Sequence, residues 1–404
     1  MFSRRRCALV LGAALLVAGC SSGEDGGGWR VVGEPATSTA APVPTTTTTA
    51  PSASIPVDQA PCEAAPFVID EKRAAIVDPR GDDFLPAGIN LTVGEYRDGE
   101  FWEKTSVTDL TEAHVATLRD VWRFNTIRLN IDANQAPDIW TSAELDRVIG
   151  LLVDAGMVAM VENHPYGTGL DPTADQIEET ATGFATLAER WAGNHCVWFN
   201  PFNEPGGKRE SSVYDVNNSD VSLDDAWVRW HTPVIDAIRA VSPTAVVVLD
   251  DTHFGQGRAG SEFETVQSAV LTYGPDLNQR YDNLLYSVHF YDRWGGNRAD
   301  LLAFFDEARR AGLAVVAGEV GGHPTEGPYF TQGYWPTSET LFTMRQPGIG
   351  ILLWHGRTGF QSGMLVARDQ GVRVAVWEVT DRADTEASGS LLWDWVHDPP
   401  PASP

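Results

Sequence analysis

Basic residues are scarce in this sequence: 29 Lys and Arg stand against 55 Asp and Glu, which gives a formal net charge of −26 at pH 7. A surface this negative repels nucleic acid, anionic lipid head groups and phosphate-rich substrates. Neutral polymers are not repelled, and we expect no nucleic-acid partner. A glycine-rich phosphate loop between a strand and a helix is also missing, which weighs against a nucleotide-binding sheet.

Common metal-binding motifs are missing as well. The nine histidines include no His-x-x-x-His pattern, and the four cysteines form no closely spaced pair. One alternative remains, a three-histidine site in which His164, His253 and His289 converge. We expect no metal and no cofactor.

Long apolar runs are absent beyond the N-terminus, so no later segment is expected to span a bilayer. Arg4–Arg6 precede an apolar stretch from Cys7 to Gly19, the pattern of a signal peptide over residues 1–19. The stretch ends in Val17-Ala18-Gly19-Cys20, which resembles the lipobox of bacterial lipoproteins. This resemblance implies an acylated Cys20 and an extracellular, cell-surface protein tethered to the outer face of the membrane. The alternative is an ordinary signal peptide cut elsewhere.

Residues 20–61 are rich in Gly, Ser, Thr and Pro and contain almost no large apolar residues. Such a segment buries too little surface to offset its ordering entropy, so it is predicted to be a disordered linker. Residues 62–404 are apolar and rich in tryptophan and are predicted to form one folded domain. We expect this domain to be a monomer.

Two cysteines are left once Cys7 is removed with the signal peptide and Cys20 is acylated. These are Cys62 and Cys196, for which a structural disulfide is the natural interpretation and two free thiols the alternative. Cys196 begins the fourth predicted strand, and Cys62 precedes a predicted hairpin over Phe67–Asp78. A bridge between them would tether this hairpin to the bottom of the fold.

Eight β-type runs alternate with helix-type segments, which is typical of a (β/α)8 barrel or a doubly wound sheet. Without a phosphate loop the barrel is favoured. The predicted strands are Phe84–Asn90, Thr126–Asn130, Met157–Glu162, Val197–Asn203, Ala245–Asp250, Leu284–Phe290, Ala314–Glu319 and Ile349–Trp354. The predicted helices are Leu110–Val121, Ala143–Ala155, Ala185–Trp191, Ala226–Val241, residues 262–273, Leu301–Ala311 and Ser388–His397, with a hairpin inserted at Met364–Asp381.

Catalytic groups of such a barrel lie where the strands end. Glycoside hydrolysis needs one carboxylic acid to protonate the leaving oxygen and a second carboxylate to attack the sugar or activate water. Glu204 follows the fourth predicted strand and Glu319 ends the seventh, on opposite sides of the barrel mouth. Polar and aromatic residues at the strand ends are Arg128, His164, Tyr166, Asn203, Glu204, Asp251, His253, His289, Tyr291, Glu319 and Trp354.

Three motifs resemble glycoside hydrolase family 5 and the wider clan of retaining (β/α)8-barrel glycosidases. They are Asn203-Glu204-Pro205, Gly318-Glu319 and Trp354, and the likeness extends over roughly residues 84–356. It implies that Glu204 is the general acid/base and Glu319 the nucleophile of a retaining hydrolase.

The same resemblance assigns roles to the surrounding residues. Asn203 would bond the sugar 2-hydroxyl, and Arg128 and Tyr291 would keep Glu319 ionised. The remaining residues are His164 and His289, which would contact the sugar or orient the carboxylates, and Trp354, which would form the apolar floor under the sugar ring.

The expected substrate is a neutral polysaccharide or oligosaccharide, a β-1,4-linked glucan or mannan. Segments at 164–167 and 251–256 resemble bacterial β-mannanases, whereas His355-Gly356 and Gly321–His323 depart from mannanases and cellulases alike. Trp102, Trp294 and Trp335 are candidates for lining sugar subsites, with core packing as the alternative. Two other functions stay open: a sugar-binding lipoprotein without hydrolysis, and a transglycosylase that uses the same site.

Overall fold

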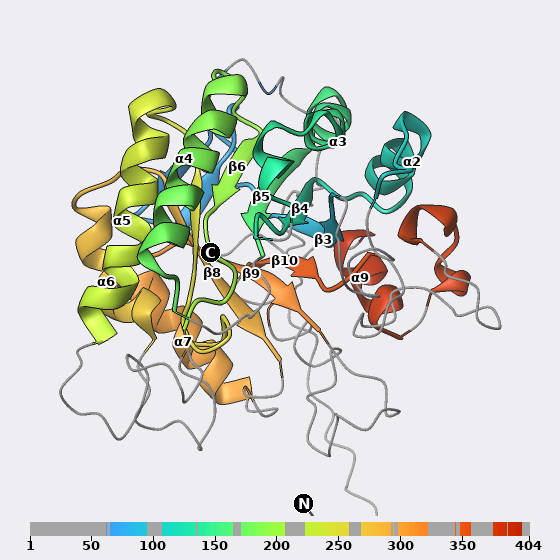
Figure 1. Cartoon of the computed structure of the whole chain (residues 1–404). Helices are drawn as coiled ribbons and strands as arrows, with labels where there is room; N and C mark the ends of the chain where they lie inside the picture. Colours follow the sequence, from blue (N-terminus) through green and yellow to red (C-terminus); the bar gives the residue numbers. More distant parts are fainter. Residues whose placement is uncertain are drawn as a thin grey trace, which may run out of the picture. The chain divides into compact units, whose positions relative to one another are not determined.

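The computed structural model describes most of the chain between residues 62 and 397 (Figure 1). The signal peptide, Cys20 and the linker lie outside the described residues, as do Tyr166, Trp102 and Trp335. The described residues are 62, 65–94, 107–134, 136–164, 171–206, 223–257, 268–291, 294, 298–321, 344, 348–356, 375–385 and 387–397.

Eight parallel strands close into a barrel, in which each strand pairs with the next along the chain and the last pairs with the first. The strands are fully buried because helices cover their outer face and side chains fill the interior. The predicted (β/α)8 barrel is confirmed. The strands are β3 (Ala87–Thr92), β4 (Thr126–Ile131), β5 (Val158–Asn163), β6 (Val197–Asn200), β7 (Val247–Asp250), β8 (Leu284–Phe290), β9 (Val315–Val320) and β10 (Gly350–Leu353).

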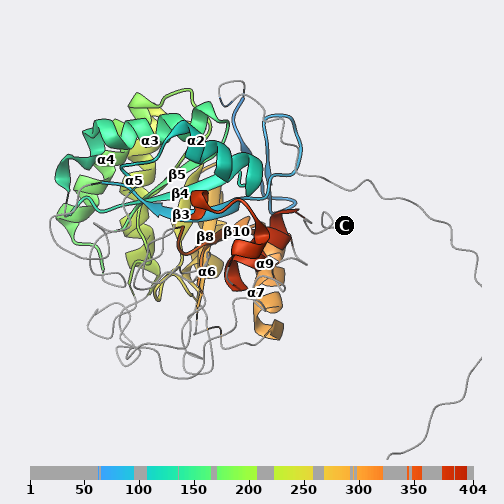
Figure 2. The same ribbon diagram turned by 90° about the vertical axis from the view of Figure 1, so that its right-hand side faces the viewer.

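Helices surround the barrel, and α4 and α5 pack against each other along one side (Figures 1 and 2). The side chain of Ser142 caps α3, and Thr173 forms a capping box with Gln176 at the start of α4. The helices are α2 (Glu112–Ala116), α3 (Ala143–Asp154), α4 (Ala174–Arg190), α5 (Leu223–Val241), α6 (Ala269–Asn278), α7 (Arg298–Arg310) and α9 (Ala387–His397). Shorter helical turns are η1 (Thr117–Val121), η2 (Pro137–Thr141), η5 (Val376–Glu378) and η6 (Arg382–Asp384).

A hairpin covers the end of the barrel at which the strands begin. Asn283, which precedes β8, accepts a hydrogen bond from the N–H of Ile69 and donates one to the carbonyl of Phe67. Phe67 also packs edge-on against Trp198, with ring centroids 5.2 Å apart. The hairpin predicted over residues 67–78 is therefore confirmed. Its antiparallel strands are β1 (Val68–Asp70) and β2 (Ala75–Val77).

A disulfide joins Cys62 to Cys196, as the sequence predicts. Cys196 immediately precedes β6, so the bridge ties the segment before the hairpin to the bottom of the barrel. Beside it, the N–H of His195 donates to the carbonyl of Cys62 at 2.8 Å. A cross-link between residues 134 apart in sequence removes much freedom from the unfolded chain and stabilises by about 3–5 kcal/mol.

Several predicted elements have different bounds. β6 ends at Asn200 instead of 203, and α4 begins at Ala174 well before the predicted residue 185. The helix expected at 262–273 forms at Ala269–Asn278. Of the hairpin expected at 364–381, residues 364–374 lie outside the described part, and the remainder contains the 3₁₀ turn η5 in place of a strand.

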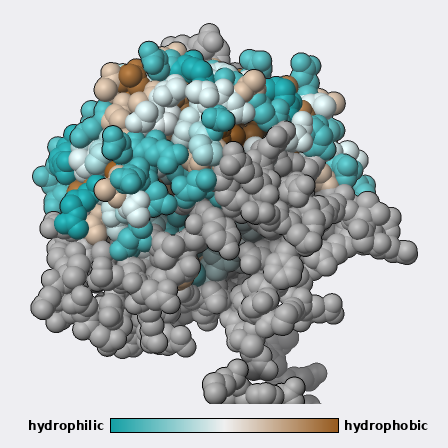
Figure 3. Space-filling view, viewed as in Figure 1, coloured by the Kyte–Doolittle hydropathy of each residue, from teal (hydrophilic) through white to brown (hydrophobic). Residues whose placement is uncertain are grey.

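The described surface is mainly hydrophilic on the face shown in Figure 3. Among the described residues, the large apolar side chains that are exposed are Val68 and Val241, at 48% and 37%. Within the same residues, no helix combines the length and the apolar character needed to cross a membrane.

Candidate active site

Polar side chains fill the inside of the barrel where the strands end. Arg128 on β4 lies opposite Asn90 on β3, and Glu162 on β5 lies opposite Asn130 on β4. All four are completely buried. Because an unpaired polar group is costly to bury, such residues must satisfy one another. This end of the barrel therefore holds a polar network and not an apolar core.

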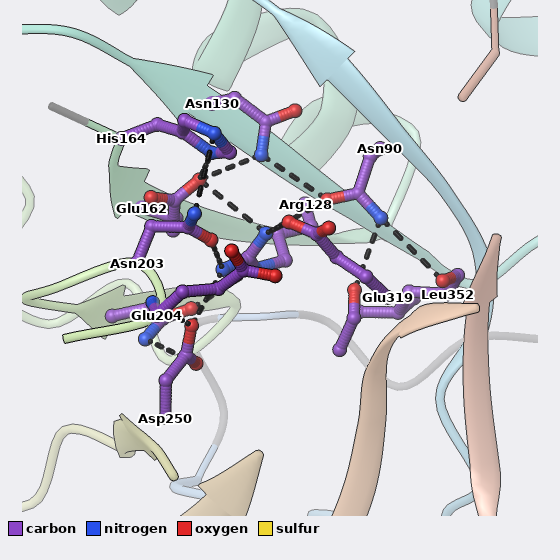
Figure 4. Close-up of polar contacts among 12 residues, drawn as sticks. Asn90, Arg128, Asn130, Glu162, His164, Asn203, Glu204, Asp250, Glu319 and Leu352 are labelled. Atoms are coloured by element: carbon purple, nitrogen blue, oxygen red, sulfur yellow. Dashed lines mark hydrogen bonds and ion pairs between the residues drawn. The ribbon is translucent and has the colours of Figure 1, made fainter. Parts of the chain in front are cut away.

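Arg128 lies at the centre of this network (Figure 4). Its Nη1 donates to Glu319 Oε1 at 2.8 Å, and its Nη2 donates to Asp250 Oδ2 at 3.0 Å and to Asn203 Oδ1 at 2.8 Å. Burial would lower the pKa of Arg128, but the carboxylates of Glu162, Asp250 and Glu319 raise it above its ordinary value. The guanidinium is thus a permanent cation whose planar fork fixes several partners at once.

Glu319 belongs to β9 and is 3% exposed. While Oε1 accepts from Arg128, Oε2 accepts from the hydroxyl of Tyr291 at 2.7 Å. A neighbouring cation and a donated hydrogen bond both favour a charged carboxylate. Burial and the charges of Glu319 and Glu204 hold the pKa of Tyr291 well above its ordinary value, so the phenol stays a donor. Both oxygens of Glu319 are accordingly held in place by hydrogen-bond donors, one of which is a cation.

The chain leaves the sheet before it reaches Glu204. β6 stops at Asn200, and Glu204 has a φ of 46°, in the left-handed region that residues other than glycine seldom adopt. The backbone N–H of Glu204 donates to Asp250 Oδ2 at 3.2 Å. This break lets the neighbouring side chains of Asn203 and Glu204 both enter the network, as Figure 4 shows.

The side chain of Glu204 lies close to that of Glu319. Its Oε1 is 2.8 Å from His289 Nδ1. One oxygen of each glutamate and a ring nitrogen of His289 lie within 4.8 Å of one another. Burial raises the pKa of Glu204, although the hydrogen bond from His289 opposes this effect. The two carboxyl groups therefore have different surroundings: burial favours the protonated form of Glu204, whereas Glu319 accepts hydrogen bonds from Arg128 and Tyr291.

His289 on β8 is fully buried between three carboxylates. Nδ1 lies 2.8 Å from Glu204 and 3.6 Å from Glu319, and Nε2 lies 3.3 Å from Asp250. Burial alone would lower the pKa of His289, but Glu319 and Asp250 raise it to about 10. Gly255 packs against the ring: a Cβ there would come within 2.5 Å of the imidazole, so a side chain would displace it.

His164 connects Asn203 to a further carboxylate. Arg128 donates to the amide oxygen of Asn203, so the amide nitrogen faces His164 Nε2 at 3.2 Å and donates to it. The proton of His164 then resides on Nδ1, which lies 3.2 Å from Glu162 Oε2. Through this chain, Glu162 orients the amide that the sequence analysis assigned to the sugar 2-hydroxyl.

Two of the tryptophans that the sequence suggests for sugar binding, Trp354 and Trp294, lie within the described residues. Trp354 is 6% exposed and stacks on His164, with ring centroids 5.4 Å apart, so it borders the network. Trp294 is 2% exposed and packs against Phe290 and Phe304. It belongs to the core, the alternative that the sequence left open, and does not line a subsite.

The position of Asp251 corrects a prediction, because the sequence placed this residue among the polar groups at the barrel mouth. It lies outside the network and accepts a hydrogen bond from the N–H of Ala269 at 2.9 Å and another from the hydroxyl of Ser268, at the start of α6. Asp250 faces the barrel interior instead. Successive residues of a strand point to opposite faces, so two adjacent aspartates cannot both face inward.

Five polar residues inside the strands belong to the network but were not predicted from the sequence. A usable signal existed, because each is a polar residue near the end of an otherwise apolar run, where burial is costly without a partner. These residues are Asn90, Asn130, Glu162, Asn200 and Asp250.

The cluster of Glu204, His289 and Glu319 also has the ligand types of a metal site. His289 Nδ1 already lies 2.8 Å from Glu204 Oε1, however, and both oxygens of Glu319 accept hydrogen bonds from Arg128 and Tyr291. The predicted alternative of three converging histidines is not among the groups of potential ligands that the described residues form.

Sequence comparison identifies the family. The model of cellulase, glycosyl hydrolase family 5, matches residues 77–358. A mannan endo-1,4-beta-mannosidase of Salipaludibacillus agaradhaerens is 24% identical over 72% of this chain and 81% of its own length. An endoglucanase of Clostridium saccharobutylicum is 22% identical over 53% of this chain and 43% of its own length.

Solved structures share the fold. The catalytic domain of the Thermobifida fusca endoglucanase with cellotetraose superposes with a TM-score of 0.60 at 18% identity, over 82% of this chain and 97% of that one. The β-mannanase of Streptomyces thermolilacinus with mannohexaose gives 0.58 at 18%, over 82% and 95%. The chain belongs to glycosyl hydrolase family 5 and is a glycoside hydrolase.

Proposed function

We propose that this enzyme cleaves a β-1,4-linked glucan or mannan with retention of the anomeric configuration. The observation that carries the proposal is the pair of facing glutamates, of which Glu204 has a raised pKa and Glu319 accepts hydrogen bonds from Arg128 and Tyr291. Retaining glycosidases place their carboxyl groups about 5–5.5 Å apart, and inverting ones about 6.5–9.5 Å apart to admit a water. Oxygens of Glu204 and Glu319 within 4.8 Å support the shorter class.

The reaction takes two displacements. In the first, Glu319 attacks the anomeric carbon while Glu204 gives its proton to the departing oxygen, which leaves a glycosyl ester on Glu319. In the second, Glu204 takes a proton from water, the water oxygen bonds to the anomeric carbon, and the ester breaks. Both residues thereby return to their starting states. The raised pKa of Glu204 suits the first proton transfer.

The surrounding residues supply binding and orientation. Asn203 is held by Arg128 and His164, so it presents a fixed amide beside Glu204 that we assign to the sugar 2-hydroxyl. Trp354 gives an apolar surface for the C–H face of a sugar ring.

Two relatives guide the choice of polymer. One is named a mannan endo-1,4-beta-mannosidase and the other an endoglucanase, at similar identity to this chain. A net charge of −26 favours uncharged polymers of this kind over polyanions.

The test is to incubate the enzyme with mannan and with β-glucan and follow the anomeric protons of fresh product by NMR. We expect product with retained configuration from one of the two polymers, and that polymer is then identified as the substrate. Inverted product would contradict the double displacement. The same spectra separate hydrolysis from transfer to a second sugar, because transfer lengthens some products.

Substitution of each glutamate separates their roles. Glu204→Gln should lose polymer cleavage yet still react with an aryl glycoside whose leaving group needs no proton. Glu319→Gln should lose both reactions, by about 10³-fold or more, since no nucleophile remains. If the activated substrate rescues Glu319→Gln instead, the two roles are reversed.

We also propose that Cys20 carries a lipid and holds the enzyme at the cell surface. The lipobox-like Val17–Cys20 supports this location, and the disulfide between Cys62 and Cys196 is compatible with an oxidising compartment. A mature N-terminus at Cys20 with the mass of attached acyl chains is expected from mass spectrometry. An unmodified N-terminus elsewhere would contradict it.

A further inference from the structure

Asp250 contacts the backbone of Glu204 and two residues that contact the glutamates, Arg128 and His289, and the proposed reaction assigns it no role. Its Oδ2 accepts from Arg128 Nη2 at 3.0 Å and from the backbone N–H of Glu204 at 3.2 Å, and it lies 3.3 Å from His289 Nε2. Its Oδ1 accepts from Asn200 at 3.0 Å. The side chain is completely buried, so it acts through its neighbours and not on a sugar.

One of these contacts fixes the backbone of Glu204. A φ of 46° is unfavourable for a glutamate and persists only when the surroundings hold it. The N–H of Glu204 is held by Asp250 Oδ2, and Asp250 itself is fixed by Arg128 and Asn200. This contact therefore helps to aim the Glu204 side chain at Glu319.

A second contact concerns charge. The approach of His289 Nε2 to Asp250 is an ion-pair contact without good hydrogen-bond geometry, so its attraction depends on a proton on the ring. The groups that face His289 are Glu204 after β6, Asp250 on β7 and Glu319 on β9, and Arg128 on β4 lies next to them. Of the three carboxylates, Glu204 and Glu319 change charge during the reaction, whereas Asp250 does not.

We propose that Asp250 is a positioning residue of this hydrolase, which fixes the backbone of Glu204 and keeps His289 protonated throughout the catalytic cycle. The inference rests on the roles proposed for Glu204 and Glu319. When Glu319 is esterified, its negative charge disappears, and Asp250 remains as the fixed counter-ion of His289. The protonated ring can then continue to donate to Glu204 while Glu204 gains and loses its proton.

The pKa directions agree with this arrangement. Burial would raise the pKa of Asp250, but Arg128 and His289 together hold it far below its ordinary value. Asp250 is therefore favoured as an anion.

Asp251 offers a matched control. It is the same residue type, one position along, equally buried, and directed at Ser268 and α6 instead of the glutamates. We compare Asp250→Asn, which keeps the size of the side chain and removes its charge, with Asp251→Asn. Two readouts are taken: the kinetics on the glycan that the wild type cleaves, and the ¹⁵N resonances of His289 between about pH 5 and 11.

The expected result for Asp250→Asn is a fall in kcat of about 10- to 100-fold with KM changed much less, since a charged hydrogen-bond partner is lost. The His289 ring should also lose its proton at lower pH than in the wild type. Asp251→Asn should change neither quantity, even where it lowers stability. A fall in kcat with unchanged His289 titration, or equal effects of the two variants, would overturn the proposal.

If Asp250→Asn does not fold, the wild-type protein provides the test of the proposed role of Asp250. Its His289 ring should carry protons on both nitrogens at about pH 8, well above the ordinary imidazole range. A neutral ring would overturn the inference whatever the activity. Failure of the proposed function is a separate outcome: the wild type would then cleave neither polymer.

Discussion

The two ends of the barrel are built in opposite ways. At the end where strands begin, Phe67 packs on Trp198, and a disulfide from Cys62 to Cys196 ties the hairpin in place. At the end where strands finish, Arg128 is surrounded by buried carboxylates and amides, and Glu204 adopts an unfavourable backbone conformation.

This difference separates stability from chemistry. Apolar contacts and a cross-link stabilise without imposing a charge, so they suit the bottom, where no reaction takes place. Desolvated ion pairs add little net stability but fix charge and geometry, which is what the two carboxyl groups proposed for catalysis require. Changes at the mouth should therefore affect activity and pH dependence as well as stability, and changes at the bottom should affect stability alone.

The largest effect is expected for Arg128→Ala. This change leaves Glu162, Asp250 and Glu319 without their shared cation. Breaking a buried ion pair costs about 3–5 kcal/mol. Urea unfolding should show that loss, and activity should fall below detection. The surface pair of Arg382 and Asp394 is the control, since both side chains are about half exposed. If Arg382→Ala destabilises the protein as much as Arg128→Ala, burial of the charges is not the reason.

Removal of the disulfide is the matching change at the bottom. Cys62→Ser with Cys196→Ser should lower the free energy of unfolding by about 2–5 kcal/mol, while kcat at moderate temperature stays within about twofold, because the bridge lies at the opposite end from the glutamates. Thermal unfolding and steady-state kinetics measure the two quantities. A large loss of kcat in folded protein would show that the ends are coupled.

The mouth should also make stability depend on pH. Burial would lower the pKa of His289, but Glu319 and Asp250 raise it from 6.5 to about 10. The ring loses its proton at about pH 6.5 in the unfolded chain, so its stabilisation is complete below that pH and is lost as the pH rises to about 10. The free energy of unfolding measured in urea should therefore fall as the pH rises across this range. The decline should be smaller in His289→Gln; an identical decline would mean that other groups cause it.

The smallest effect is expected on the outer face of the hairpin. Val68 is 48% exposed, whereas its neighbour Phe67 is 5% exposed and packs on Trp198. Val68→Ala should change the free energy of unfolding by at most about 0.5 kcal/mol, and Phe67→Ala should cost about 3 kcal/mol or more. Similar losses for both would mean that the hairpin is not held by its buried side.

Much of the fold was predictable because apolar runs repeat at strand and helix spacing. All eight strands appear close to where the sequence places them, with ends that differ by at most three residues, and Glu204 and Glu319 come together at the mouth. The start of α4 was missed, although Thr173 and Gln176 carry a capping-box signal.

The part of the site that was not predicted from the sequence depends on which face of a strand points into the barrel. Asp250 and Asp251 are chemically identical, and only the pleat of β7 within the closed barrel decides that Asp250 meets Arg128. The same holds for Glu162, whose partner Asn130 lies on a different strand. Pairing across strands is a property of the assembled barrel and not of a local pattern.

The central claim is that Glu319 forms a bond to the sugar while Glu204 handles the proton. An activated 2-fluoro glycoside slows the second displacement and allows the glycosyl enzyme to accumulate, so the mass of the intact protein and of its peptides reports the attacking residue. The predicted result is one added sugar, located on the peptide that contains Glu319. A sugar on Glu204, or an inverted product without any adduct, would contradict the account.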